Sequence, residues 1–504
     1  MSKLFKRIGR AAMFFVLTGQ LLVGTVLAQQ QAYDGYTYDF WGSSVPSRAG
    51  YFPKDIYFGM DMGTKDIIGG EDLFVYQNTL YLLDSNSKSV LSINSDYQVT
   101  SVLSQFYNAD GSQYIMKEPT GMYIRNDVMY IADKGNGCVI RCSLDGKIQY
   151  IYQRPETALL DDVTEFKPIK VVADDVGNCY VLCEGIYQGF VNYDKNGKYI
   201  GFFGGNQVQL SSNMFSAFFW KKLLSREQAK NMIRFVPVEY SNAYIVGDFI
   251  YTVTKSNTNS LNEVQKLNPI GKNVLHFPLN DAAYPKNNFG DVETAYYKQT
   301  LYDSQLVDIQ VDEDDFITVL DFERGRLFQY DQECNIVAIF GSVGDQKGNF
   351  INPTAVEKFN GTYVVLDKAK QNLTTFEETE YMTYVREGLR YYNKGIKLNS
   401  LEEMMEPWEK VLQMNSNYRL AYLNIGRALS QQGLYKEALP YFKLAESRKE
   451  YSQAFRMVRT QFVKQYFVGI VVAVIVVLVL LIGFIRFAKR KLGFERKKVK
   501  MVFK

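Results

Sequence analysis

Apolar and polar residues alternate in short runs along the middle of the chain, and the runs recur as one repeated unit. Each copy has a short apolar strand, a turn, and a second strand that usually ends in aspartate. A variable turn and a third strand follow. Alternation over four to eight residues is typical of half-buried β-strands. The second strands of the copies are residues 80–84, 129–133, 180–183, 250–254, 317–321 and 363–367.

The spacing of these copies predicts the architecture. Their last residues are 49, 50, 71, 67 and 46 residues apart. A four-stranded propeller blade takes about 40–50 residues, so three steps fit one blade each and two carry insertions. Six copies predict an all-β propeller of six blades over residues 50–380, after a linker at 29–49. Turn residues stand beside the third strands at Asp145-Gly146, Asn196-Gly197, Pro269 with Gly271, and Asp331.

One of the two longer steps contains a segment of helical character. Residues 207–236 interrupt the strand pattern between the third and fourth copies, and residues 212–224 read as a helix. Too many aromatic residues fall within six positions for one helical face to bury them all. One face is expected to pack on the propeller, and the other is either buried there too or offered to a partner. We expect the second case, a contact with a membrane-embedded partner or the lipid interface through Phe215, Phe218, Phe219 and Trp220.

After the propeller the period changes from that of strands to that of helices. Over residues 381–448, Gly426, Ala438 and Phe442 stand at positions typical of tetratricopeptide helix pairs, where small residues let the helices approach closely. Trp408 precedes Phe442 by 34 residues, the length of one such repeat. The earlier copy lacks the glycine of the later one. The pattern predicts a small all-α segment, followed by a juxtamembrane helix at 449–464 that continues without Gly or Pro into the next segment.

The two ends of the chain read as membrane signals. Four basic residues, an apolar stretch from Ala11 to Leu27 and the Val26-Leu27-Ala28 pattern predict a signal peptide at 1–28. An uncleaved anchor is the alternative. Residues 465–485 carry no charge and are long enough, at about 30 Å, to cross a bilayer as a helix. The tail at 486–504 holds nine basic residues and one acidic residue. Short positive flanks stay in the cytoplasm, so we expect a single-pass protein of the cell membrane with residues 29–464 outside.

The charge balance of the chain also depends on these ends. The chain has 57 basic and 54 acidic residues. Without the four basic residues of the signal and the charges of the tail, 44 basic residues face 53 acidic ones. An acidic ectodomain argues against nucleic acid, whose binding rests on phosphate neutralisation. The basic tail is suited to anionic lipid headgroups.

Two residue types invite a chemical interpretation. Five cysteines are too few for a disulfide scaffold, and Cys138 with Cys142 and Cys179 with Cys183 are spaced four apart. Burial as small apolar residues, bridging between blades and metal binding are the three alternatives. The aspartates that end the second strands could form a ring of metal ligands or bases, or could cap the turns that follow. We expect capping at Asp84, Asp133, Asp321 and Asp367.

The joint between the fifth and sixth copies, residues 340–353, resembles the FGxxGxxxGxFxxP segment that connects blades of NHL-repeat proteins. Phe106, Gly111, Pro119 and Gly121 form a degraded version between the first two copies. Lyases of the NHL class hold zinc with several histidines, whereas this chain has one, His276. No P-loop, HExxH, EF-hand or Rossmann signature occurs. We therefore expect a binding protein without a cofactor rather than an enzyme. A calcium-dependent lactonase-type hydrolase remains the less favoured alternative.

The assembly of signal, propeller, helices, span and basic tail resembles membrane-anchored NHL-repeat proteins of Gram-positive type. Residues 234–254 match that family closely. The resemblance implies an extracytoplasmic scaffold that accompanies a sugar-type ABC transport permease in an envelope complex. An extracellular carbohydrate-binding propeller is the alternative, favoured by the 37 tyrosines and 34 phenylalanines.

Overall fold

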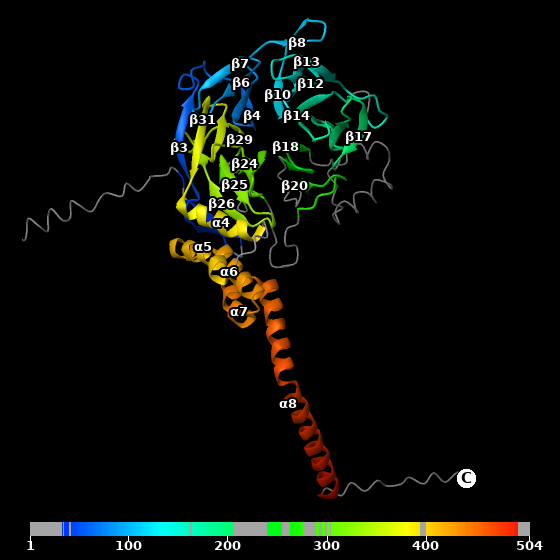
Figure 1. The fold of residues 1–504 in the computed structure, drawn as a ribbon, viewed down its shortest axis with the longest axis vertical. Helices are drawn as coiled ribbons and strands as arrows, with labels where there is room; N and C mark the ends of the chain where they lie inside the picture. The colour runs from blue at the N-terminus through cyan, green and yellow to red at the C-terminus, as the bar shows by residue number, and fades with distance from the viewer. Residues whose placement is uncertain are drawn as a thin grey trace, which may run out of the picture. The chain divides into compact units, whose positions relative to one another are not determined.

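The computed structural model describes residues 33, 35–39, 42–160, 164–205, 239–254, 263–275, 289–291, 295–297, 300–302, 304–393 and 400–491. The chain forms two compact units, Met1–Thr383 and Tyr384–Lys504. Figure 1 shows the strands of the first unit and the helices of the second.

The first unit is a six-bladed β-propeller, as the repeat predicts. Each blade is an antiparallel sheet, and in the first five blades the strands follow one another along the chain. The first strands of consecutive blades are neighbours. The first strand of the sixth blade also lies beside that of the first blade, so the ring is closed. The first three blades are β4 (Gly70–Tyr76), β5 (Thr79–Asp84), β6 (Ser89–Ile93) and β7 (Val99–Leu103); β10 (Pro119–Arg125), β11 (Val128–Asp133), β12 (Cys138–Ser143) and β13 (Ile148–Tyr152); and β14 (Lys167–Ala173), β15 (Cys179–Glu184), β16 (Phe190–Tyr193) and β17 (Tyr199–Phe203).

The remaining blades complete the ring. In the described part of the chain the fourth blade has three strands, and the fifth and sixth have four each. They are β18 (Tyr240–Val246), β19 (Phe249–Thr254) and β20 (Val264–Leu267); β23 (Leu306–Val311), β24 (Ile317–Asp321), β25 (Arg326–Tyr330) and β26 (Ile336–Phe340); and β29 (Pro353–Phe359), β30 (Thr362–Asp367) and β31 (Asn372–Glu378) with β3 (Tyr51–Phe58).

The sixth blade takes its outermost strand from the other end of the propeller sequence. β3 pairs antiparallel with β31, with Tyr51 opposite Glu378 and Phe58 opposite Asn372. The ring is therefore held by a ladder of hydrogen bonds between its first and last segments. The repeat pattern did not predict this strand, because β3 belongs to none of the six copies and its partner lies more than 300 residues away.

Short elements lie outside the blades. One turn of 3-10 helix, η1 (Lys134–Asn136), joins β11 to β12. The pairs β8–β9 and β27–β28 occupy the two joints that carry the NHL-like glycines. The short pairs are β1 (Tyr36–Tyr38) with β2 (Ser44–Pro46), β8 (Phe106–Tyr107) with β9 (Gln113–Tyr114), β21 (Ala295–Tyr297) with β22 (Thr300–Tyr302), and β27 (Ser342–Val343) with β28 (Asn349–Phe350).

The predicted turn residues lie where the sequence analysis put them, after the third strand of their blades. Each turn closes with a backbone hydrogen bond from its fourth residue to its first. The donor and acceptor pairs are Gly146 to Ser143 (3.0 Å), Gly197 to Asp194 (2.9 Å), Gly271 to Asn268 (2.8 Å) and Cys334 to Asp331 (3.0 Å).

The second unit is helical. Gly426 on α6 (Arg419–Gln431) faces Phe442 on α7 (Tyr435–Leu444) so closely that a Cβ at Gly426 would lie 2.6 Å from the phenylalanine ring. Gly388 on α4 (Glu380–Asn393) faces Trp408 on α5 (Leu401–Met414) in the same way, with a Cβ 2.5 Å from the indole. The earlier helix pair therefore does have its glycine, four residues further from its aromatic partner than in the later pair. The helices are α4 (Glu380–Asn393), which begins at the end of the first unit, α5 (Leu401–Met414), α6 (Arg419–Gln431), α7 (Tyr435–Leu444) and α8 (Arg448–Lys491).

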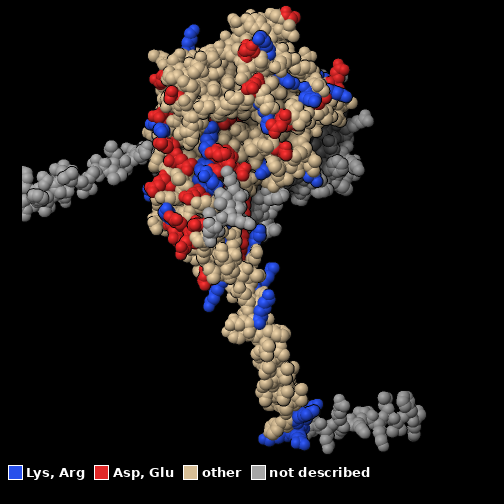
Figure 2. Space-filling model, viewed as in Figure 1, with Lys and Arg blue, Asp and Glu red and all other residues tan. Residues whose placement is uncertain are grey.

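The last helix, α8, is continuous over 44 residues. It joins the predicted juxtamembrane segment to the predicted span, as the absence of Gly and Pro between Glu446 and Val468 led us to expect. Its most apolar window has a mean hydropathy of 3.5, and none of that window is buried. By length and composition this helix can cross a membrane. Figure 2 shows its uncharged stretch ending at a cluster of basic residues.

Candidate functional site

The innermost strands of the six blades share one irregularity that builds a polar centre. Each has a β-bulge near its start, where the pairing with the second strand shifts register. The first residue paired after the bulge occupies the equivalent position in every blade. We call these six residues the axial ring. They are Asp72, Gly121, Lys170, Asn242, Asp308 and Ala355.

The lysine of the axial ring reaches across a whole blade. Lys170 Nζ, on the third blade, lies 2.8 and 2.6 Å from the two carboxylate oxygens of Asp72 on the first. The second blade contributes Gly121, where a Cβ would lie 3.1 Å from Cδ of Lys170 and 2.5 Å from the Ile169 carbonyl oxygen. The backbone N–H of Met122 also donates to Asp72, at 2.7 Å. Because side chains of non-adjacent blades meet here, the ring surrounds the propeller axis.

Asp308, the other aspartate of the ring, also accepts hydrogen bonds from one ring side chain and from one backbone amide. Asn242 Nδ2 donates to one carboxylate oxygen of Asp308 at 2.7 Å, and the Val356 N–H donates to the other at 2.7 Å. Both aspartates thus accept a backbone amide of the following blade. The ring therefore links the first blade to the second and the fifth to the sixth.

Burial sets the electrostatics of this centre. Asp72 and Lys170 have only 3% and 7% of their side chains exposed. Burial raises the pKa of Asp308 to about 7, although the charge of Lys170 opposes the shift. Burial also lowers the pKa of Lys170, but the nearby charges of Asp72 and Asp308 outweigh it, so the net pKa is raised. The ammonium of Lys170 is therefore retained at neutral pH, and Asp72 is its closest partner.

A second polar layer lies two residues further along the inner strands. Burial and the charge of Asp308 raise the pKa of Glu357 well above its usual value. Gln310 is buried, and its Oε1 has no hydrogen-bond partner in the part of the chain that the structure describes. No group of three or more His, Cys, Asp or Glu in those same residues is placed to hold a metal ion. The centre thus holds a buried ion pair, Lys170 with Asp72, among other buried polar groups.

The aspartates at the strand ends act as caps, which confirms that interpretation. Asp84 accepts the N–H groups of Asn86 (2.8 Å) and Ser87 (3.1 Å) in the turn that follows it. Asp367 accepts four, from the turn that follows and from the joint that precedes its blade. Their donors are Ala369 (3.0 Å), Lys370 (3.0 Å), Ile351 (2.7 Å) and Asn352 (3.2 Å). Asp133 and Asp321 likewise accept amides from both sides. Their second role, fastening the joint between blades, was not predicted.

All five cysteines are free and buried. Cys138 and Cys142 lie on β12, and Cys179 and Cys183 lie on β15. Burial raises the pKa of Cys142 to about 12, so its thiol stays protonated at neutral pH. Of the three alternatives for the cysteines, the structure agrees with burial as small apolar residues.

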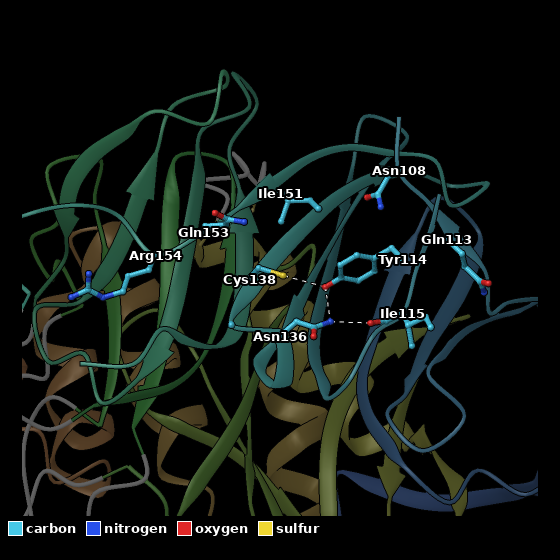
Figure 3. Close-up of a pocket in the computed structure, with 10 residues that line it drawn as sticks. Asn108, Gln113, Tyr114, Ile115, Asn136, Cys138, Ile151, Gln153 and Arg154 are labelled. Carbon is cyan, nitrogen blue, oxygen red and sulfur yellow. Dashed lines mark hydrogen bonds between the residues drawn. The ribbon is translucent and has the colours of Figure 1, made fainter. Parts of the chain in front are cut away.

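A cavity of about 640 Å³ opens where the joint β8–β9 meets the second blade. We call it the joint pocket (Figure 3). The hydroxyl of Tyr114 donates to Asp133 at 2.9 Å, and Asn136 Nδ2 donates to that hydroxyl at 3.0 Å. Asn136 also donates to the Ile115 carbonyl at 2.9 Å. The lining is Asn108, Gln113, Tyr114, Ile115, Asn136, Gly137, Cys138, Ile151, Gln153 and Arg154.

The joint pocket combines amide and phenol groups with two isoleucines, a surface that can hydrogen-bond hydroxyl groups and pack against an apolar ring face. It was not predicted, because its residues come from two separate joints and a strand end. The candidate contact residues of the insertion, Phe215, Phe218, Phe219 and Trp220, lie outside the described residues, as does His276.

No family model matches the chain, and no curated protein matches it significantly. Among solved structures, virginiamycin B lyase from Staphylococcus aureus is 9% identical over 64% of this chain and 99% of its own, with a TM-score of 0.37. A protein of unknown function from Bacteroides thetaiotaomicron is 13% identical over 62% of this chain and 70% of its own, with a TM-score of 0.39. Hydrazine synthase from Kuenenia stuttgartiensis is 11% identical over 63% of this chain and 97% of its own, with a TM-score of 0.35. At these identities the likeness concerns the fold alone, which the chain's own strand pairings establish.

Proposed function

We propose that this protein is a membrane-anchored interaction scaffold, with its propeller outside the cell and its C-terminal tail in the cytoplasm. The observation that carries the proposal is α8. An apolar helix with no buried side chain in its most hydrophobic window is unfavourable in water, and a bilayer removes that cost. Removal of residues 1–28 as a signal peptide would leave α8 as the membrane anchor.

The larger number of basic residues after the apolar stretch, nine in residues 486–504 against five in residues 448–464, supports the orientation. Lys489, Arg490 and Lys491 close α8, and six more basic residues stand elsewhere in the tail from residue 486 onward. Basic residues within about 20 residues of a span favour the cytoplasmic side. The same residues are suited to anionic lipid headgroups at that surface.

The helices of the second unit support a binding role. Gly388 against Trp408 and Gly426 against Phe442 reproduce one close helix contact twice, which is the packing expected of tetratricopeptide-type pairs. Such arrays bind protein segments on their exposed surfaces. Together with the family resemblance, this favours a partner in the envelope, and a sugar-type ABC transport permease is the one we propose.

Binding is favoured over catalysis because the polar centre of the propeller is sealed. Asp72 and Lys170 neutralise each other, and the ring side chains are less than a tenth exposed. A substrate would have to break this pairing to reach them, and a buried charge without its partner is strongly unfavourable.

A protease protection experiment tests the proposal. Protease added to intact cells should digest the propeller and leave intact a tag placed after Lys504. Permeabilised cells are the control, in which the tag should also be digested. Digestion of the tag in intact cells would contradict the orientation. In-cell crosslinking with mass spectrometry then asks whether the partner is a transport permease.

A carbohydrate-binding propeller is the second candidate, and the joint pocket is the observation that favours it. Its size suits one or two sugar rings, and Gln113, Asn136 and Gln153 supply amides. Titration of the chain with cell-wall oligosaccharides, using Gln153→Ala and the exposed Lys198→Ala as a matched pair, tests it. Weaker binding in the Gln153→Ala variant alone would support this function, and absence of binding would remove it.

A further inference from the structure

The first part of α8 carries an exposed stripe of aromatic side chains. Tyr451, Phe455, Phe462 and Tyr466 follow one another at intervals of four, seven and four residues. At about 100° per residue, these four positions lie on one face of the helix, within an arc of about 60° around its axis. Their exposed fractions are 37%, 44%, 57% and 49%. Tyr451 and Phe455 stack on each other with ring centroids 6.3 Å apart, and the rings of Phe462 and Tyr466 meet at a tilt with centroids 4.9 Å apart.

Contact with lipid headgroups explains only the two aromatic residues of the stripe that lie nearest the predicted span. Aromatic residues are common where a span meets the headgroups, which explains Phe462 and Tyr466. Phe455 and Tyr451 stand 10 and 14 residues before Gln465, where the uncharged stretch begins. At 1.5 Å per residue that is about 15 and 21 Å along the helix. The headgroup layer is only about 5–8 Å thick on each side, so these two rings lie beyond it.

The same face continues into the predicted span. Gly469 and Ala473 are 18 and 22 residues after Tyr451, which places them on the face of the aromatic stripe. Nothing lies within 4 Å of a Cβ built on Gly469. Small residues four apart allow a second helix to approach closely within a membrane. We call the aromatic stripe together with Gly469 and Ala473 the docking face.

The described part of the second unit leaves the docking face uncovered. α7 packs against a neighbouring side of α8, where Ala454 is buried. That side lies about 60° away from Tyr451 around the helix. The docking face is therefore adjacent to an occupied side and is itself unoccupied.

Charge distinguishes between the occupants that could cover it. Residues 448–464 hold five basic residues and one acidic residue, Glu450, which already pairs with Arg427 at 3.2 Å. The Arg459 guanidinium lies 5.3 Å from the centre of the Phe455 ring, at the edge of the stripe. A second copy of this chain would run parallel in the same membrane and bring the same cations together. Like charges at an interface oppose association.

We propose that the docking face binds a transmembrane helix of a different membrane protein, whose extension outside the bilayer carries acidic residues beside an apolar stripe. The proposal rests on the proposed function, since it requires α8 to span the membrane with its first part outside. It adds the segment that makes the contact and the chemistry of the partner.

The test places a photo-crosslinking amino acid at Phe455 in the full chain in cells. The matched control places it at Gln453, on the opposite side of the helix. We expect an adduct from position 455 and several-fold less from 453. Mass spectrometry of the crosslinked peptide should identify the outer end of a transmembrane segment with Asp or Glu beside it. Arg459→Glu should reduce the adduct several-fold, while Arg459→Lys should preserve it.

Four outcomes would overturn the proposal: an adduct between two copies of this chain, adducts with lipid only, adducts of equal yield from both positions, or no adduct. Protease protection of the same cells separates this inference from the proposed function. If the tag after Lys504 is protected and position 455 gives no adduct, the docking face is wrong and the topology stands. If the tag is digested, the topology itself has failed.

Discussion

The axial ring and α8 place their side chains in opposite surroundings. In the axial ring, charged groups are removed from water and satisfied by one another, as Lys170 and Asp72 are. In α8, large apolar side chains from Phe467 to Ile485 are exposed along the helix and have no protein partner around them. Both arrangements are stable only with the right surroundings. The closed ring of blades buries the first region within the protein, whereas the length and composition of the second suit it to a bilayer.

This difference indicates where function is to be sought. A polar centre that buries an ion pair and accepts backbone amides of the next blade holds blades together. An exposed apolar helix with aromatic and basic neighbours is uncovered in the described part of its unit. On the proposed function, the interaction surfaces lie at the helices and joints, away from the propeller axis.

The largest expected effect comes from removing the cation of the axial ring. Lys170→Met leaves the carboxylate of Asp72 buried without its partner, which costs about 3–5 kcal/mol for a broken buried pair. Urea denaturation of the detergent-solubilised chain should show a lower midpoint. Lys198→Met, at an exposed lysine, is the matched control and should stay within about 0.5 kcal/mol.

A second change makes that prediction more specific. Adding Asp72→Asn to Lys170→Met removes the unpaired charge, so it should restore part of the lost stability. If the single variant is as stable as the parent, or the double variant is less stable than the single one, the ion pair does not hold the centre together.

A charge placed in the predicted span tests the other region. Ile475 stands at the middle of residues 465–485. Ile475→Arg should make insertion less favourable by about 3 kcal/mol, because arginine is poorly accommodated at the centre of a bilayer. The membrane-bound fraction after carbonate extraction should fall, and Ile475→Leu should leave it unchanged. Full retention of the arginine variant in the membrane would indicate that α8 does not cross it.

The pH dependence of stability provides a smaller test, of the axial ring and of the second polar layer beside it. Burial raises the pKa of Asp308 to about 7 and that of Glu357 well above its usual value. The native state therefore binds protons that the unfolded state has released between about pH 4 and pH 7. The contribution of these groups is fully present below their unfolded pKa and is lost as pH rises through the folded one. We expect the free energy of unfolding to be lower at pH 8 than at pH 5.5, by on the order of 1–2 kcal/mol.

The matching variant is Glu357→Gln, which cannot ionise. It should be more stable than the parent at pH 8 and close to it at pH 5.5, giving a flatter profile. An unchanged slope would mean that Glu357 does not take part in the proton uptake.

The repeated unit could be predicted from the sequence because its pattern is local. Its second strand recurs six times, with three steps of 46–50 residues and two longer steps that carry insertions, so the six blades could be counted before their arrangement was known. The ring closure by β3 could not be found in this way, because Tyr51–Phe58 follows no copy and pairs with residues far along the chain. The continuity of α8 was predictable from the absence of helix-breaking residues.

The axial ring was missed for a different reason. Its members share a position and no chemistry, since they range from lysine to glycine and alanine. Each stands 12 to 14 residues before the last residue of the second strand in its blade, which is the signal that could have aligned them. Their pairing also skips a blade, and only the three-dimensional ring brings Lys170 to Asp72.

Site-specific labelling tests the central claim, that α8 crosses the membrane with the propeller outside. The five cysteines of the chain are all buried and free, so an introduced cysteine provides the dominant reactive thiol. Lys198→Cys places it on an exposed turn of the propeller, and Lys489→Cys places it near the basic end of α8. With a membrane-impermeant maleimide, intact cells should label the Lys198→Cys variant only, and the Lys489→Cys variant should react after permeabilisation. Labelling of Lys489→Cys in intact cells, or protection of Lys198→Cys until permeabilisation, would contradict the account.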